Sequence, residues 1–145
     1  MLVLPVLSII TDKIFFQTNG DLVSLIGKWF VFWAIGWRLF IAGVRQIVQP
    51  QFTAEKIFNL KSKESGIIVR ELGFANVCFG LSGILSVVFH QFRTSAEFVG
   101  GMYLGLAGIY HLIKKPENTN EKLAMMSDLF IFVIMMTLLL LNFNT

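Results

Sequence analysis

Apolar residues fill four long segments of this chain, and polar residues gather in the links between them. The segments cover about residues 22–49, 66–89, 98–113 and 123–141. A helix needs about 20 mainly apolar residues to cross the hydrocarbon core of a bilayer. The pattern therefore predicts an all-α integral membrane four-helix bundle, in which residues 1–145 form a single membrane domain.

Residues 1–20 begin with a further apolar run, which Asp12 and Lys13 interrupt. The run is too short for a membrane span, and it lacks the basic first region of a signal peptide. Two structures fit this stretch: a helix that lies in the membrane interface, or a re-entrant short hairpin that leads into the first span. We favour the N-terminal interfacial helix, which would end at Asn19 and Gly20.

Capping residues predict where several helices begin and end. Asp21 is a favoured residue before the first span, and Pro50 ends that span. Thr53 precedes a short amphipathic helix in the first loop, which we expect on the membrane surface, although a plain polar loop fits equally well. Thr94 and Glu97 have the spacing of a capping box at the start of the third span.

Aromatic residues crowd the first half of the first span. They are Trp29, Phe30, Phe32, Trp33 and Trp37. Tryptophan is enriched at the level of the lipid headgroups, so this cluster is typical of an aromatic belt near one membrane interface.

The composition agrees with a membrane protein. Hydrophobic residues make up 55% of the chain, charged residues only 14%, and the mean hydropathy is +0.71. Soluble domains carry about a quarter charged residues, so the lipid bilayer is the expected surrounding. The net charge of +3 comes from basic residues that flank the apolar segments, and it does not indicate nucleic-acid binding. Cys78 is the single cysteine, which excludes a disulfide framework.

The basic residues favour one orientation in the membrane. The loops at 50–65 and 114–122 hold six lysines, namely Lys56, Lys61, Lys63, Lys114, Lys115 and Lys122. The link between the second and third spans has Arg93 as its basic residue, and none follows the fourth span. The positive-inside rule therefore predicts both basic loops in the cytoplasm and both termini outside.

Polar residues inside the predicted spans form two layers when depth is counted at 1.5 Å per residue. The layer roughly 5–8 Å inside the cytoplasmic boundary holds Arg45, Glu71 and Asp128. The layer at a depth of roughly 15 Å holds Arg38, Asn76 and Tyr103. Charged groups at such depths are costly in lipid unless they are paired or face a cavity.

We interpret these six residues as a site for a small anionic or amphipathic ligand. Arg38 and Arg45 would supply positive charge, Glu71 and Asp128 would hold the arginines in place, and Asn76 and Tyr103 (the remaining two) would donate or accept hydrogen bonds. Each charge also has a purely structural interpretation. Arg45 can snorkel to the interface, Arg38 can form an ion pair between helices, and Asp128 can stabilise a helix N-terminus.

No catalytic residue, metal site or cofactor is predicted. His90 ends the second span and His111 the third, on opposite sides of the membrane, so they cannot share a haem. The chain has no nucleotide-binding loop, nucleophile elbow or zinc-protease motif.

Three alternatives to ligand binding remain. They are a proton-coupled transporter, working as a homo-oligomer and titrating at Asp128 or Glu71; an accessory subunit of a quinone-linked oxidoreductase; and a structural or assembly protein.

Three stretches carry a family resemblance: KWFVFWAIGWRLFIAGVRQIVQPQFTAEKIF, RELGFANVCFGLSG and HLIKKPENTNEKLAMMSDL. They resemble an uncharacterised family of small bacterial multi-pass integral membrane proteins and, more distantly, DoxX-like four-helix proteins. The resemblance covers nearly the whole chain after the first two dozen residues. It implies a four-span bundle in an inner membrane and no established activity. Some DoxX-like proteins are associated with quinone-linked thiosulfate oxidation, but this chain has no catalytic motif to which that activity could be transferred.

Overall fold

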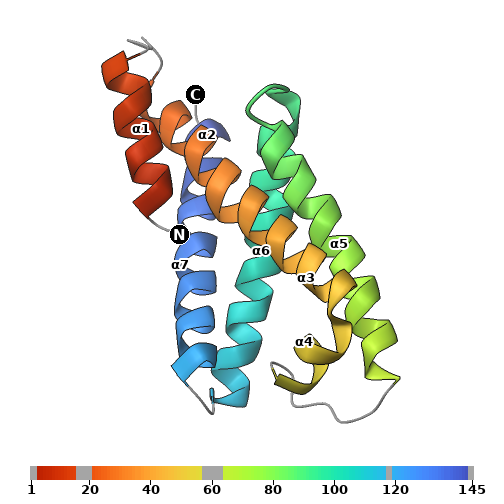
Figure 1. Ribbon diagram of the computed structural model, residues 1–145. Coiled ribbons are helices and arrows are strands. Elements are labelled where there is room, and N and C mark those ends of the chain that lie inside the picture. Colours follow the sequence, from red (N-terminus) through yellow and green to blue (C-terminus); the bar gives the residue numbers. More distant parts are fainter. Residues whose placement is uncertain (1–2, 16–20, 57–63, 117–118, 144–145) are drawn as a thin grey trace.

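The computed structural model describes residues 3–15, 21–56, 64–116 and 119–143, and these residues are mainly helical with no strand among them (Figure 1). The elements are α1 (Val3–Phe15), α2 (Leu22–Phe30), the π-helix η1 (Val31–Trp37), α3 (Arg38–Val48), α4 (Pro50–Lys56), α5 (Ser65–Leu85), α6 (Gln91–Lys114) and α7 (Thr119–Phe143). Within the described residues, four stretches are long and apolar enough to cross a membrane: Leu22–Val48, Ser65–Leu85, Gln91–Lys114 and Glu121–Asn142. The predicted all-α chain with four spans is confirmed.

Several predicted helix ends are wrong. α5 stops at Leu85 and a tight turn leads directly into α6, so the third span begins at Gln91 and already includes Thr94 and Glu97. The expected capping box is therefore absent, and the Glu97 side chain is fully buried instead. Thr53 lies inside α4, because that helix begins at Pro50, and proline is well suited to a first helical position.

Glycines allow α5 to pack closely on the first span. A Cβ atom added to Gly80 would lie 2.3 Å from the backbone nitrogen of Phe40, and one added to Gly43 would lie 2.6 Å from the carbonyl oxygen of Gly73. Small residues at helix interfaces let membrane helices approach each other until their backbones touch. This contact orients the lower half of the span, α3, toward α5 (Figure 1).

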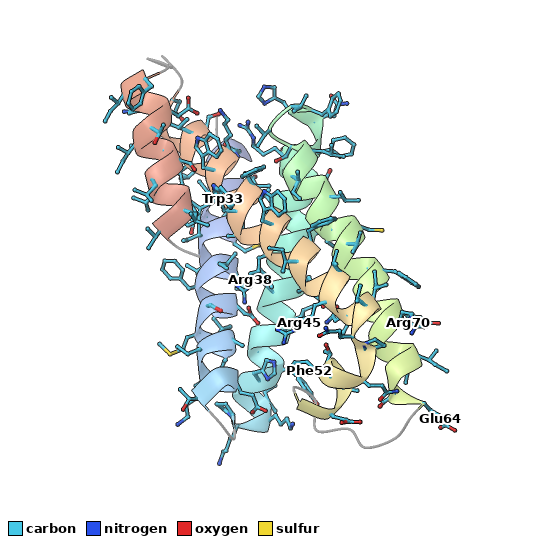
Figure 2. All side chains as sticks on the ribbon, viewed as in Figure 1. Trp33, Arg38, Arg45, Phe52, Glu64 and Arg70 are labelled. Atoms are coloured by element: carbon cyan, nitrogen blue, oxygen red, sulfur yellow. The ribbon has the colours of Figure 1, made fainter. Side chains whose placement is uncertain are left out.

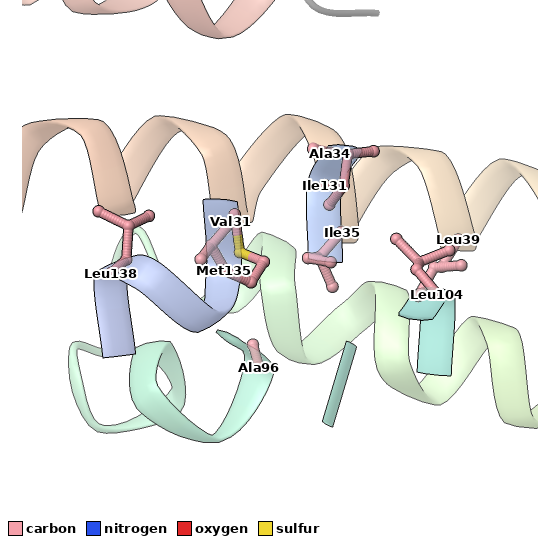
Figure 3. Packing of buried hydrophobic residues seen from close by; sticks show 9 residues of the cluster. All are labelled: Val31, Ala34, Ile35, Leu39, Ala96, Leu104, Ile131, Met135 and Leu138. Atoms are coloured by element: carbon pink, nitrogen blue, oxygen red, sulfur yellow. The ribbon is translucent and has the colours of Figure 1, made fainter. Parts of the chain in front are cut away.

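α6 and α7 form the second tightly packed pair. Met135, Phe132 and Leu129 of α7 fill the space left by glycines of α6. The hydrophobic core lies between this pair and the first span (Figure 3). Its buried members are Val31, Ala34, Ile35, Leu39, Ala96, Leu104, Ile131, Met135 and Leu138. The first span thus packs against α5 on one face and against the pair of α6 and α7 on another.

α1 lies antiparallel to the first span (Figure 1). Asp12 accepts hydrogen bonds from Lys28 Nζ at 2.7 Å and from Trp29 Nε1 at 2.9 Å. Farther down both helices, Trp33 Nε1 donates to Ser8 Oγ at 2.9 Å. These contacts join α1 to the first span as two antiparallel helices. The interfacial and the re-entrant placement of residues 1–20 both stay predictions. The predicted stop at Asn19 and Gly20 lies outside the described residues.

Candidate functional site

Arg38 joins the first span to α7. Its Nη2 atom donates to Asp128 Oδ1 in an ion pair and to Ser127 Oγ at 3.0 Å. The side chains of Arg38 and Asp128 are 18% and 8% exposed. Opposite charges buried together cancel the large cost that either would have alone.

The structure pairs Asp128 with Arg38, whereas the predicted layers grouped it with Arg45. α7 begins at Thr119, four residues before the predicted start of the fourth span, so nine helical residues, about 14 Å of helix, precede Asp128. The predicted start of this helix was therefore wrong.

Asn76 and Tyr103 are neighbours, as their shared layer predicted. The Asn76 Nδ2 atom donates to Gln46 Oε1 at 2.7 Å, inside the closely packed contact of α3 with α5. Asn76 Oδ1 is buried and has no hydrogen-bond partner. The Tyr103 ring packs on Phe79, with 5.5 Å between ring centroids. Gln46 was missed from the sequence, where a single amide near the end of a span carries no specific signal.

Arg45 and Glu71 lie apart from the Arg38 ion pair. Both residues are exposed. The Arg45 guanidinium lies over the Phe52 ring of α4, with 4.5 Å from Cζ to the centroid (Figure 2). The six residues predicted as one ligand site are therefore distributed over an inter-helix ion pair, a buried amide contact and two exposed positions.

A groove between α1 and the first span offers the clearest space for a ligand. One part has a volume of about 520 Å³ and is lined by Leu4, Leu7, Ser8, Thr11, Asp12, Lys28 and Trp29. The other part, of about 630 Å³, is lined by Leu4, Ser8, Trp29, Phe32, Trp33, Trp37 and Ile41. Leu4, Ser8 and Trp29 line both parts. We call the two parts together the aromatic groove.

The wall of the aromatic groove is a row of touching rings. Phe32 lies edge-on to Trp29 and to Trp33, with centroid distances of 5.7 and 4.9 Å, and Trp33 stacks on Trp37 at 6.5 Å. The row runs about 12 Å along the helix. At one end, Lys28 Nζ lies 4.7 Å from the Trp29 ring centroid and forms the ion pair with Asp12. The aromatic cluster was visible in the sequence, but α1 turns it into the wall of a groove.

Comparison with known protein families identifies the family to which this chain belongs. The sequence model of a family described as "Family of unknown function (DUF6790)" matches residues 1–145. The chain belongs to this family. No curated protein and no solved structure matches the chain. The match confirms membership of an uncharacterised family, and the DoxX-like relationship rests on the motif resemblance alone.

The described part of the DUF6790 chain contains no group of three His, Cys, Asp or Glu side chains that could hold a metal ion. His90 and His111 lie at opposite ends of α6, roughly 30 Å apart along the helix. The aromatic groove of the DUF6790 chain offers groups suited to ligand binding. It has an apolar aromatic wall with one ammonium–carboxylate pair at its end.

Proposed function

We propose that this multi-pass membrane protein binds an amphipathic ligand in the aromatic groove. The polar head of the ligand would lie beside Lys28 and Asp12, and its apolar part along the row from Trp29 to Trp37. The observation that carries the proposal is the continuity of the two parts of the groove, which joins an ion pair to an aromatic wall.

The composition of the groove suits such a ligand. Small-molecule sites are concave, mainly apolar, and contain a few placed polar groups. The Nε1 atoms of Trp29 and Trp33 already donate to Asp12 and Ser8, so the rings offer their apolar surfaces to a chain. An ammonium has three N–H donors, and Asp12 takes one from Lys28. The others suit the oxygen atoms of a headgroup or of a quinone ring.

The Arg38 region is a weaker candidate for the ligand. An anion there would have to displace Asp128, because that carboxylate already compensates the guanidinium charge. We therefore assign the Arg38 ion pair to helix packing and the amphipathic ligand to the groove.

Tryptophan fluorescence tests the proposal directly, because all three tryptophans of the chain line the groove. The detergent-solubilised protein is titrated with a short-chain quinone and, separately, with a brominated lysophospholipid. One of these two compounds should quench the tryptophan fluorescence to a saturating level. The Lys28→Met/Asp12→Asn double variant removes both charges together, so neither is left unpaired. We expect it to weaken binding about tenfold through the lost charged hydrogen bond.

Arg70→Met serves as the control, because it removes an exposed cation on α5, away from the residues that line the groove. It should leave the binding curve unchanged. Quenching that rises linearly with both quenchers, and equally in all three proteins, would contradict a site in the groove.

We also propose that the basic loops face the cytoplasm of a bacterial inner membrane. Lys115 and His90 lie just beyond the two ends of α6, so they report on opposite sides. In a Cys78→Ala background, a membrane-impermeant maleimide added to intact cells should label His90→Cys and should label Lys115→Cys only after lysis. The reverse order of labelling would invert the topology.

A further inference from the structure

Glu97 is buried completely inside the protein, at 0% exposure. It lies in the first third of α6 and faces α2 and α7. Its Oε2 atom is 3.5 Å from Asn142 Nδ2 of α7, and its Oε1 atom has no hydrogen-bond partner. The polar atoms of this carboxyl group are therefore poorly satisfied for a group that is shielded from water.

The backbone of α2 leaves space for this carboxyl group. A Cβ atom added to Gly27 would lie 3.0 Å from Glu97 Oε1. The missing side chain of Gly27 thus leaves room for the carboxyl group against α2.

The nearest cation is Arg93, whose charge interacts with Glu97 without an ion pair within 4 Å, and whose Nε atom is buried with no hydrogen-bond partner. Arg93, one helical turn before Glu97, donates from Nη1 to Ser24 Oγ at 3.1 Å, and its Nη2 lies 2.9 Å from His90 Nδ1. The other two buried acidic residues among those described, Asp12 and Asp128, each form an ion pair. Glu97 forms none within 4 Å in the same part of the chain.

We propose that Glu97 is a proton-binding site, which holds a proton while α2, α6 and α7 pack as they do here. A buried carboxylate without an ion pair is much more costly than the neutral acid, and a bound proton removes that charge. The groups that face it are Arg93 on its own helix, with His90 beyond it, Ser24 and Gly27 on α2, and Asn142 on α7. Of these, Arg93 and His90 are the side chains with ionisable groups. The proton would come from water at the exposed turn that holds His90 and return there.

This site is separate from the aromatic groove, and it gives the proton-coupled alternative a different carboxyl group from Asp128 or Glu71.

Infrared spectroscopy of the full chain in lipid bilayers tests whether Glu97 holds a proton. At neutral pH the wild type should show a carboxylic-acid C=O band that shifts in D₂O. The Glu97→Gln variant should lose this band, and Glu71→Gln, which changes an exposed glutamate, should keep it.

Isotope labelling of the wild type provides a test that needs no variant to fold. Glutamate labelled with ¹³C in the side-chain carboxyl should shift the band, and aspartate labelled in the same way should not. Absence of an acid band at neutral pH, its persistence in Glu97→Gln, or a shift with labelled aspartate would each overturn the proposal. None of these results depends on whether the groove binds an amphipathic ligand.

Discussion

Replacing Arg38 by leucine is expected to destabilise the folded protein by about 3–5 kcal/mol, because it leaves Asp128 buried without its counter-charge. Asp128→Leu should cost a similar amount, since it strands the guanidinium instead. Unfolding of the protein in mixed micelles, titrated with sodium dodecyl sulfate, measures the free energy of unfolding in each variant.

The double variant Arg38→Leu/Asp128→Leu completes this test. Replacing both members of a buried ion pair with apolar residues is often close to neutral, so most of the lost stability should return. Arg45→Leu is the matched control: Arg45 is exposed on the same span and lies over Phe52, and its loss should cost less than about 1 kcal/mol. If the single changes at Arg38 and Asp128 simply add in the double variant, the ion pair does not hold the first span to α7.

The second large effect is expected at the contact between α5 and the first span. Gly80→Ala would place a Cβ atom 2.3 Å from the Phe40 nitrogen, a backbone atom that cannot move without its helix. The two helices would have to separate, which should destabilise the protein by about 3 kcal/mol. The same unfolding measurement applies.

Gly66→Ala provides the comparison on the same helix. Its added Cβ would meet the far end of the Gln51 side chain, which can shift more easily than a backbone atom. Because alanine also has a better helix propensity than glycine, we expect Gly66→Ala to be neutral or slightly stabilising. Equal losses at Gly80 and Gly66 would mean that close backbone contact does not decide the packing of α5.

The Arg38 ion pair and Glu97 show how one error in a helix boundary changes the interpretation of a site. Arg38 was expected to need a partner because of its depth, and the structure supplies Asp128 from α7. Glu97 was expected to cap a helix because of its spacing from Thr94, and the structure buries it within α6. The first turns of a membrane-spanning helix can lie inside or outside the hydrocarbon core. Hydropathy therefore locates the span but leaves its ends uncertain by several residues.

The sequence by itself determined the four spans and the polar residues that need an explanation, because these follow from the local hydropathy of each segment. Only the tertiary structure decided which of those residues meet. Asp12 with Lys28, Arg38 with Asp128 and the closure of the aromatic groove by α1 all join segments that are distant along the chain. Such contacts depend on helix crossing and relative depth, which the glycine contacts between helices set and which no single segment encodes.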